Sequence, residues 1–435
     1  MKNKNETIYA LSTAPGKSAL ALIRVSGPNA YRLISSISTN MPNNPNLASF
    51  NEIISETGQT IDQTVTTFYK SPKSFTGEDV VEVATHGGNA VIKKIFEVLS
   101  KKKEMRLATP GEFTRRAFEN NKLDLTQVEA IADLVNAETE IQRKQAISHL
   151  SGAFFKSSKK IFEDLKGILA NIEAVIDFTD EDLPENLMKD ISEQIQNKIT
   201  KIDKILASSS LGISLREGFL VTILGKPNTG KSSFINHISG KDIAIVTDRP
   251  GTTRDLIESF LDLGGYPVKF IDTAGIRESE DLVEKIGIER ALSASKEADI
   301  NIVFVEDEKD IGFFNNIKNT IFVRSKQDVV GGTIRGNGFY NISSKDGFGV
   351  KELLSLIKGK IKDKIPAEIG YISRERHVKC LNLTKKYLED SQKVKNIDLL
   401  AEDVRLAIKT FASLFGNVDI EDILDIIFSD FCIGK

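Results

Sequence analysis

The chain has 435 residues, which is too long for one ordinary domain and predicts about three. Lys and Arg total 58 and Asp and Glu total 61, so the formal net charge is −3. This near-balance excludes a globally basic nucleic-acid coat protein, while a local basic patch stays compatible with it. The only cysteines are Cys380 and Cys432, which excludes a disulfide framework and a four-cysteine zinc site and favours a reducing compartment.

Targeting and membrane signals are absent from the sequence. No apolar run approaches the roughly 18 residues that a membrane-spanning helix needs. The lysines near the N-terminus are not followed by the apolar segment of a secretory signal. We therefore expect a cytoplasmic protein that does not enter a membrane.

The first part of the chain, residues 1–121, shows the pattern of a mixed α/β domain. Apolar runs at residues 7–11, 19–25 and 80–84 predict strands, and glycine-containing turns follow the second and third. Residues 89–101, which come directly after the last of these turns, predict a helix.

From residue 123 the apolar residues adopt a helical period. They recur on one face through residues 128–135, 162–176 and 191–208, with Lys and Glu on the opposite face. A second helical region follows Pro366 and consists of three predicted helices, at residues 374–390, 399–415 and 420–428.

Strand-type composition separates these two helical regions. Residues 219–224 begin an alternation of strands and helices that extends to about residue 364. The simplest architecture is an α/β domain inserted into a discontinuous helical domain whose two parts pack together. The predicted fold is therefore multidomain, α/β plus all-α, with an N-terminal α+β domain at residues 1–121, the first helical part at 122–214, the inserted domain at 215–365 and the second helical part at 366–435.

Residues 225–232 match the phosphate-binding motif G-x-x-x-x-G-K-[ST] in full, directly after a predicted strand and at the start of a predicted helix. In that context successive backbone N–H groups and the helix N-terminus bind the β-phosphate of a nucleotide. Lys231 would bridge the β- and γ-phosphates, and the Ser232 hydroxyl would bind Mg²⁺. The strand–helix context strongly favours this interpretation over a glycine-rich turn without nucleotide.

Further segments follow in the order expected of a Ras-like GTPase. Thr253 would reach Mg²⁺ when γ-phosphate is present, Asp272 ends a predicted strand as the second-sphere carboxylate, and the Gly275 amide would donate to the γ-phosphate. These segments favour a GTPase over a general ATPase. The predicted GTP-binding residues are Asn228, Thr229, Gly230, Lys231, Ser232, Ser233, Thr247, Arg249, Thr252, Thr253, Asp272, Thr273, Ala274, Gly275, Lys326, Asp328, Ser343, Ser344 and Lys345.

The base-reading segment, residues 325–328, reads Ser-Lys-Gln-Asp instead of the Asn-Lys-x-Asp of a GTPase. Asp328 can still accept hydrogen bonds from guanine N1 and the exocyclic amine, and adenine would leave that carboxylate unpaired. Lys326 can still lie over the base, and residues 343–345 can pack against it. Ser325 lacks the amide that ordinarily braces the site, so we expect GTP specificity to survive with weaker binding.

Hydrolysis also needs a group that orients the attacking water and a group that neutralises charge in the transition state. Ile276 stands after the Asp-Thr-Ala-Gly segment, where Ras carries glutamine, so that catalytic group is missing. Carboxylates in the following segment can take its place, and each is also compatible with a solvated loop charge: Glu278, Glu280, Asp281 and Glu284.

Short motifs that differ from one another are distributed along the whole chain. Besides the nucleotide motifs, they lie at residues 14–16, 23–27, 74–79, 86–88, 110–113, 121–125, 129–133, 286–291 and 431–435. On these motifs the whole chain resembles the MnmE (TrmE) family of tRNA-modification GTPases. The resemblance implies an N-terminal folate-binding and dimerisation domain, a discontinuous helical domain and an inserted GTPase domain.

The resemblance also implies roles for particular residues. A tetrahydrofolate derivative, either 5-formyl- or 5,10-methylene-tetrahydrofolate, would contact Arg24, Glu82, Lys122 and Lys435. Taken alone, without the family, each of these residues is better explained as a surface charge or a member of a structural ion pair. K⁺ would activate hydrolysis when two GTPase domains pair, held by Asn228, Thr247, Arg249 and Thr252. Glu284 would orient water through a bridging water, which makes Glu284 and Lys231 the predicted catalytic residues.

The family's reaction adds an aminomethyl or carboxymethylaminomethyl group to carbon 5 of the wobble uridine of certain tRNAs. The resemblance therefore implies GTP as substrate, Mg²⁺, K⁺ and folate as cofactors, a homodimer, tRNA, and a heterotetramer with the FAD-dependent partner MnmG. Two other functions stay open, which are a regulatory or ribosome-assembly GTPase switch and a folate enzyme regulated by GTP. Cys432 is a candidate nucleophile beside the implied folate site, although a buried thiol without chemistry is favoured.

Overall fold

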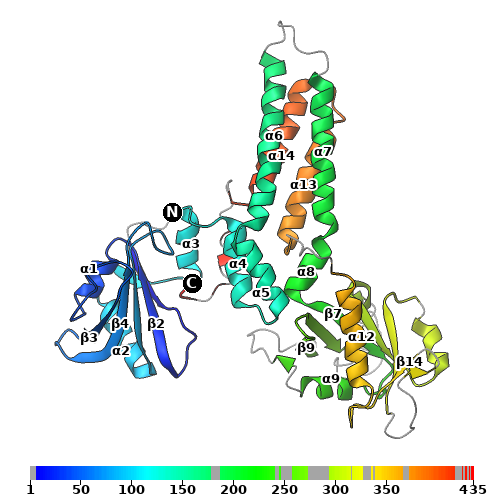
Figure 1. Cartoon of the computed structure of the whole chain (residues 1–435), viewed down its shortest axis with the longest axis horizontal. Helices are drawn as coiled ribbons and strands as arrows, with labels where there is room; N and C mark the ends of the chain where they lie inside the picture. The colour runs from blue at the N-terminus through cyan, green and yellow to red at the C-terminus, as the bar shows by residue number, and fades with distance from the viewer. Residues whose placement is uncertain are drawn as a thin grey trace, which may run out of the picture. The chain divides into compact units, whose positions relative to one another are not determined.

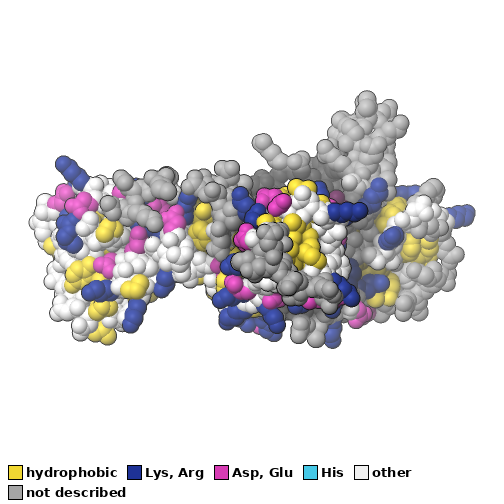
Figure 2. Space-filling view, turned by 90° about the horizontal axis from the view of Figure 1, so that it is seen from above, with side chains coloured by type: hydrophobic (Ala, Val, Ile, Leu, Met, Phe, Trp, Pro, Cys, Tyr) yellow, Lys and Arg dark blue, Asp and Glu magenta, His cyan; other side chains and the backbone are white. Residues whose placement is uncertain are grey.

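The computed structural model describes residues 6–177, 187–240, 244–245, 257–272, 293–314, 316–326, 335–336, 339–365, 372–416, 424, 427–428, 431 and 433–435. The chain divides into two compact units, Met1–Ala132 with Ala412–Lys435, and Asp133–Phe411. Positive and negative side chains are interspersed on the face drawn in Figure 2, in keeping with the small net charge. None of the described helices combines the length and apolar character that crossing a bilayer requires.

The first unit contains a six-stranded sheet of order β3-β4-β5-β2-β1-β6. Neighbouring strands are antiparallel, except that β1 and β6 are parallel. The strands predicted near residues 7, 19 and 80 are confirmed, and the bounds of the six are β1 Thr7–Leu11, β2 Ser18–Ser26, β3 Ala48–Ile54, β4 Thr60–Tyr69, β5 Val80–Gly87 and β6 Met105–Leu107.

The hairpin formed by β3 and β4 was not predicted, because polar residues occupy its inward positions. Asn51, Thr64 and Thr66 are all buried, and the Thr64 hydroxyl donates to Asn51 Oδ1 over 2.8 Å. Two buried polar side chains that bind each other satisfy their hydrogen-bonding groups inside a sheet. Their presence removes the alternation of apolar and polar residues from which a half-buried strand is predicted.

Helices cover this sheet unevenly. Helices α1 (Ala30–Ser35) and α2 (Asn89–Ser100) bury one face, where Ile95 and Leu99 pack with Val25 and Val83. Helix α3 (Glu112–Glu119) covers β1 on the other face through Phe113. Beyond it, α4 (Leu125–Val135) packs against a group of C-terminal side chains, which are Leu424, Phe428 and Phe431.

Helices that precede and follow the nucleotide-binding segment pack together in the second unit, as the insertion architecture requires. Figure 1 shows α6, α7, α13 and α14 side by side. Polar contacts join the earlier helices to the later ones, among them Lys385 with Asp203 at 2.6 Å, Gln392 with the Ser192 carbonyl at 3.0 Å and Arg405 with Glu173 at 2.9 Å. The bounds of the helices are α5 Glu140–Leu150, α6 Ala153–Asp177, α7 Leu187–Ala207, α8 Ser209–Glu217, α13 Glu375–Ser391 and α14 Ile397–Ala412.

The inserted segment forms an eight-stranded sheet of order β13-β14-β12-β11-β7-β10-β9-β8. Its centre is parallel, since β7 pairs in parallel with both β10 and β11. The bounds of its elements are β7 Phe219–Gly225, α9 Lys231–Ser239, β8 Ala244–Ile245, β9 Ile257–Asp262, β10 Pro267–Asp272, β11 Ile300–Phe304, a 3-10 helix at Glu308–Phe314, β12 Thr320–Arg324, β13 Arg335–Gly336, β14 Phe339–Asn341 and α12 Val350–Lys362.

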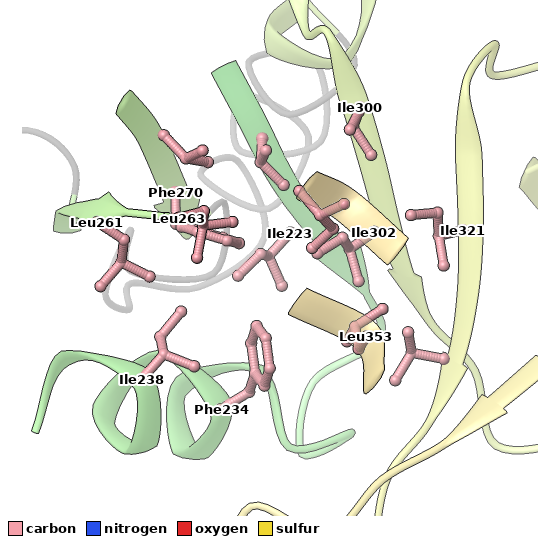
Figure 3. Close-up of a cluster of buried hydrophobic side chains, with 14 of the residues drawn as sticks. Ile223, Phe234, Ile238, Leu261, Leu263, Phe270, Ile300, Ile302, Ile321 and Leu353 are labelled. Carbon is pink, nitrogen blue, oxygen red and sulfur yellow. The ribbon is translucent and has the colours of Figure 1, made fainter. Parts of the chain in front are cut away.

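Helices α9 and α12 contribute side chains to the core of this second sheet. Figure 3 shows Phe234 and Ile238 of α9 and Leu353 of α12 against the sheet side chains, among them Ile223 and Ile302. Because the parallel strands β7, β10 and β11 end together, the loop after β7 lies at the carboxyl edge of the sheet. That edge is where ligands bind in open α/β sheets.

Candidate functional site

The loop after β7, residues 225–232, has the backbone that a phosphate cradle requires. Gly225 has φ +138°, and a Cβ atom there would lie 2.4 Å from the Phe304 carbonyl oxygen of β11. Only glycine fits so close to a neighbouring strand. Asn228 (φ +62°) and Gly230 (φ +95°) also adopt left-handed conformations, which are typical of loops whose successive backbone N–H groups bind an anion.

Lys231 lies at the start of α9 and is held by the loop itself. Its Nζ donates to the carbonyl oxygens of Gly225 (2.7 Å) and Lys226 (2.6 Å). Burial lowers the pKa of the Lys231 ammonium, and nearby Asp272 acts in the opposite direction. The N-cap residue of α9 is Gly230, which has no side chain with which to cap the helix. A cation beside the uncapped end of a helix is an arrangement suited to a phosphate group.

Oxygen ligands suited to Mg²⁺ meet next to this lysine. Ser232 Oγ donates to Asp272 Oδ2 over 3.1 Å, and Asp272 is fully buried at the end of β10. A hydroxyl and a carboxylate at the edge of a phosphate cradle are hard oxygen ligands of the kind that Mg²⁺ uses together with nucleotide phosphates. The parallel register of β7 and β10 places these two residues, each predicted to act at Mg²⁺, in direct contact.

The base-reading segment contacts the phosphate loop through Ser325. Its hydroxyl donates to the carbonyl oxygen of Thr229. One hydroxyl proton is enough to bind one carbonyl, so Ser325 makes this contact without the amide that the sequence lacks, and the predicted weaker GTP binding stays a prediction. Nearby, the Ser344 hydroxyl is buried and has no hydrogen-bond partner in the described part of the chain, as expected of a group that meets a ligand.

Other predicted residues of this site are placed differently. Ser343 is fully buried and its hydroxyl accepts from the Asp346 N–H, whereas Lys345 and Ser233 are exposed. Lys326 has φ +65°. The following predicted residues lie outside the described residues: Thr247, Arg249, Thr252, Thr253, Thr273, Ala274, Gly275, Glu284 and Asp328. Of the predicted K⁺ ligands, the structure therefore describes Asn228.

The N-terminal sheet brings two of the predicted folate residues into direct contact. Arg24 of β2 lies opposite Glu82 of β5, and both Nε and Nη2 of Arg24 lie 2.8 Å from Glu82 Oε1. The Arg24 guanidinium also lies 5.5 Å from the ring centroid of Phe75 and 5.8 Å from that of Phe113. Tyr69 donates to the same carboxylate, and burial together with Glu82 raises the pKa of Tyr69.

The other two predicted folate residues lie near the same part of the sheet. Lys122 Nζ donates to the Pro72 carbonyl over 3.0 Å, and Pro72 belongs to the loop that carries Phe75. Lys435 follows Gly434, whose carbonyl accepts from Ser12 Oγ over 3.0 Å just after β1. A Cβ atom on Gly434 would lie 2.2 Å from the Leu11 carbonyl oxygen, so glycine is what lets the C-terminus approach this strand.

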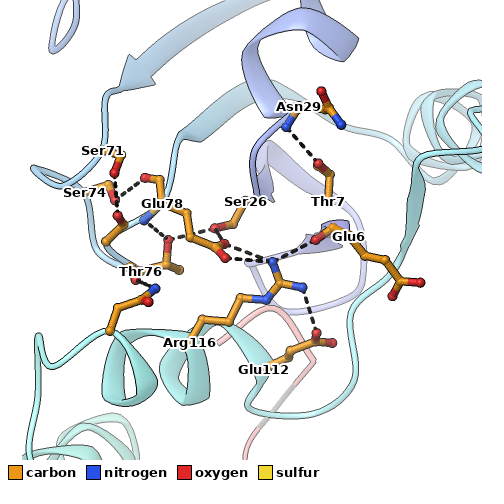
Figure 4. Close-up of polar contacts among 12 residues, drawn as sticks. Glu6, Thr7, Ser26, Asn29, Ser71, Ser74, Thr76, Glu78, Glu112 and Arg116 are labelled. Atoms are coloured by element: carbon orange, nitrogen blue, oxygen red, sulfur yellow. Dashed lines mark hydrogen bonds and ion pairs between the residues drawn. The ribbon is translucent and has the colours of Figure 1, made fainter. Parts of the chain in front are cut away.

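A buried ionic network, which the sequence did not predict, holds the loop of residues 71–79 (Figure 4). Arg116 binds Glu78 at 2.9 Å and Glu112 at 3.1 Å, and Arg106 binds Glu112 at 2.6 Å. Ser26 Oγ donates to Glu78 over 2.7 Å. Burial alone would raise the pKa of Glu112, but the hydrogen bonds from Arg106 and the Thr109 N–H hold it at about 2. The motifs at residues 74–79 and 110–113 contain charged residues, which could have indicated ion pairs. Which residues pair depends on how the strands are aligned, and the sequence alone does not show that.

The chain is similar to known proteins over its whole length. A family model described as the GTP-binding protein TrmE N-terminus matches residues 7–122, and one described as the MnmE helical domain matches residues 125–432. The chain is 40% identical to the tRNA modification GTPase MnmE of Wolbachia sp. subsp. Brugia malayi, with 100% of both chains covered. It is 42% identical to the MnmE of Pelagibacter ubique and 41% to that of Parvibaculum lavamentivorans, over 99% of this chain and 100% of each relative. The chain is thus a GTP-hydrolysing enzyme and belongs to the MnmE family of tRNA modification GTPases.

Proposed function

We propose that this protein acts in the cytoplasm with a MnmG-type FAD protein, in a heterotetramer, to modify carbon 5 of the wobble uridine of certain tRNAs. The product would carry an aminomethyl or carboxymethylaminomethyl group. The agreement with tRNA modification GTPases over 100% of their length is the observation that carries this proposal. The phosphate loop supports its GTPase part, and the Arg24–Glu82 pair supports its folate part.

The nucleotide would bind along the carboxyl edge of the second sheet. The loop amides, the N-terminus of α9 and Lys231 would hold the phosphates, and Ser232 with Asp272 would hold Mg²⁺ directly and through water. Mg²⁺ would neutralise phosphate charge. The buried Ser344 hydroxyl would contact the nucleotide near its base.

Glu284 is the proposed water-orienting carboxylate of this GTPase. Glu284→Ala is expected to abolish GTP hydrolysis while leaving GTP affinity within about twofold, because a group acting only on the attacking water contributes to the transition state alone. Glu280→Ala, which removes another carboxylate of the same segment, is the matched control and is expected to hydrolyse GTP normally. Loss of binding together with hydrolysis in Glu284→Ala would remove the proposed role.

K⁺ is proposed to activate hydrolysis through oxygen ligands from Asn228, Thr247, Arg249 and Thr252, when two GTPase domains pair. Backbone carbonyls and an amide oxygen suit a hard cation. We expect the hydrolysis rate in KCl to exceed the rate in NaCl at equal ionic strength, and Asn228→Ala to reduce that difference. Equal rates in the two salts would contradict the proposal.

A tetrahydrofolate derivative is proposed to bind beside Arg24 and Glu82 and to supply the one-carbon unit. Glu82 would accept from the N–H edge of the pterin, and Lys122 and Lys435 would bind carboxylates. The residues present fit such a ligand, because Phe75 is 39% exposed next to Arg24 and offers a ring face for a flat heterocycle. Glu82→Gln is expected to weaken 5-formyl-tetrahydrofolate binding in a titration of the full chain, while GTP affinity stays the same.

The same face of the N-terminal sheet supports the proposed homodimer. Phe50 and Val65 pair directly across β3 and β4, and they are 64% and 43% exposed. Strand alternation and register put them on the face that carries Arg24 and Glu82. Exposed apolar pairs of this kind occur at interfaces between chains. Phe50→Asp is expected to shift the chain from dimer to monomer in sedimentation velocity, and an unchanged dimer would exclude this surface.

Mass analysis of wobble nucleosides in tRNA tests the proposed function as a whole. Cells that lack this protein are expected to accumulate uridine without the carbon-5 group, and the wild-type gene is expected to restore it where Lys231→Ala does not. Unchanged modification in the deleted cells would contradict the proposal and favour a regulatory GTPase switch. Normal restoration by Lys231→Ala would instead favour a folate enzyme in which GTP is only a regulator.

A further inference from the structure

Two connections join the inserted sheet to the helices of the second unit, and one carboxylate binds both. The chain enters the sheet through α8, which ends at Glu217 just before β7 (Figure 1), and returns to the helices at Arg374, the N-cap residue of α13. Asp133 Oδ1 accepts from Arg216 Nε over 2.8 Å and from Arg374 Nη2 over 2.7 Å. Because Arg216 belongs to the entry and Arg374 to the exit, one oxygen atom joins the two connections.

The position of Asp133 on its own helix is unfavourable for a carboxylate. Asp133 lies in the last turn of α4, where the partial negative charge of the helix end repels an anion. Its side chain is 14% exposed, so water compensates little. The two guanidinium groups provide the compensation, and Glu217 Oε1 lies 2.9 Å from Arg216 Nη1. The carboxylate is therefore stabilised by its partners at the entry and exit rather than by α4.

Helix α8 is also fixed to the helices by α5. Gln142 Nε2 donates to the Arg216 carbonyl over 2.9 Å, and Gln145 Nε2 donates to the Gly212 carbonyl over 3.1 Å. Both glutamines are buried, and leaving a buried amide unpaired costs free energy. The entry is thus attached to the helices as far as the last turn before the sheet.

On the sheet side, Asp299 joins the same two connections. It directly precedes β11, and its Oδ2 accepts from the Leu220 N–H of β7 over 3.0 Å. Its Oδ1 accepts from the ammonium of Lys364, just after α12, over 3.1 Å. Asp299 moves with the sheet, whereas Asp133 belongs to the helical side. A change in the angle between sheet and helices therefore strains the contacts of Asp133.

We propose that Asp133 is a positioning residue that holds the inserted sheet, and the nucleotide bound at its edge, in a fixed orientation against the helices. Domains joined by connecting chain alone reorient readily, so such a contact is what fixes the angle. Hydrolysis activated by the pairing of two GTPase domains depends on each domain meeting the other in a suitable orientation. This consequence for hydrolysis rests on the proposed K⁺-dependent pairing, and the fixed orientation does not.

Time-resolved fluorescence anisotropy tests the orientation, with methylanthraniloyl-GDP (mant-GDP) bound to the full chain. In Asp133→Leu, which removes the shared acceptor, the long rotational correlation time is expected to fall about twofold, because the sheet then reorients partly by itself. The Kd for mant-GDP should stay unchanged. Asp203→Leu is the matched control, since it removes a carboxylate that joins α7 to Lys385 of α13, and it should keep the wild-type correlation time.

The anisotropy distinguishes positioning from a contribution to stability alone. A lower urea midpoint in Asp133→Leu with an unchanged correlation time would overturn the positioning role. Equal shortening in Asp133→Leu and Asp203→Leu would overturn it as well. If Asp133→Leu does not fold, Arg374→Met breaks the exit contact in its place. A shorter correlation time in that variant supports the role, and the wild-type value overturns it.

Hydrolysis separates this inference from the proposed K⁺ activation. In Asp133→Leu, kcat for GTP in KCl is expected to fall severalfold with KM unchanged, because the nucleotide still binds while pairing becomes less frequent. An unchanged kcat together with a shorter correlation time would overturn the consequence for hydrolysis. Equal wild-type rates in KCl and NaCl would instead contradict K⁺ activation, and the anisotropy would still decide the role of Asp133.

Discussion

The two sheets of this protein differ in the partners that their buried charged side chains bind. In the N-terminal sheet, acidic and basic side chains bind one another, as in the contacts of Arg116 with Glu78 and Glu112. At the edge of the second sheet, Lys231 donates to backbone carbonyls and makes no ion pair within the described residues. A cation held by carbonyls can exchange them for phosphate oxygens, whereas a mutually neutralised network cannot give up a member without leaving a charge buried.

This difference indicates two ways of preparing a site. The phosphate loop would bind its ligand with its own backbone and one lysine, so the groups proposed to recognise the ligand are also those that shape the loop. In the N-terminal unit the network fixes the loop of residues 71–79, and the groups proposed to contact a ligand are others, such as Glu82, which binds Arg24, and Lys122, which binds the Pro72 carbonyl. The first kind of site should lose function when a charge is removed, and the second should lose stability.

The largest effect is expected from Arg116→Met, which leaves Glu78 and Glu112 without their shared cation. Arg116 is 8% exposed at the side chain, and removing one partner of a buried ion pair costs about 3–5 kcal/mol. Urea unfolding of the full chain should show this loss. Arg405→Met breaks the exposed contact with Glu173, and its effect on the free energy of unfolding should be far smaller, because water screens an exposed ion pair. Similar losses in the two variants would contradict the structural role of the network.

Next in size is Lys231→Ala, which removes the ammonium group from the phosphate loop. We expect kcat/KM for GTP to fall about 100- to 1000-fold, the effect of removing one fixed donor from a charge-stabilising site, while the unfolding midpoint changes little. Lys226→Ala is the matched control, since it keeps the carbonyl that contacts Lys231 and removes only an exposed side chain. Equal losses of activity in both variants would mean that general positive charge, rather than this position, is what matters.

The same difference explains what was predictable from the sequence. The phosphate loop is a contiguous motif between a strand and a helix, so its chemistry is encoded within eight residues of chain. Arg24 and Glu82 are 58 residues apart, and their contact depends on the pairing of β2 with β5, which no local pattern specifies. Their role was implied only by resemblance. The Ser325 contact spans 96 residues and escaped notice for the same reason.

Acid should act on the N-terminal unit through Glu112. Its pKa is about 2 in the folded chain against an ordinary value of 4.5, so its contribution to stability is complete above pH 4.5 and is lost as the pH falls toward 2. We expect the urea midpoint of the wild-type chain to fall between pH 5 and pH 3, and Glu112→Gln to fall less steeply over that range. Parallel pH profiles for the two chains would show that another carboxylate controls acid unfolding.

The smallest effect is expected from Phe75→Leu, which removes the ring beside Arg24 and keeps an apolar side chain. The Arg24 guanidinium lies 5.5 Å from the ring centroid, and such a contact at a partly exposed site contributes about 0.5–1 kcal/mol. The N-terminal site is held in place by contacts among its side chains, whereas the phosphate loop is shaped by its own backbone. This variant should therefore lower the stability of the N-terminal unit slightly and leave kcat and KM for GTP unchanged. Phe348→Leu, a partly exposed phenylalanine of the second unit, serves as the control for loss of a ring. If Phe75→Leu changed GTP hydrolysis in the full chain, the independence of the two kinds of site would be wrong, because a weak contact in one would then govern chemistry in the other.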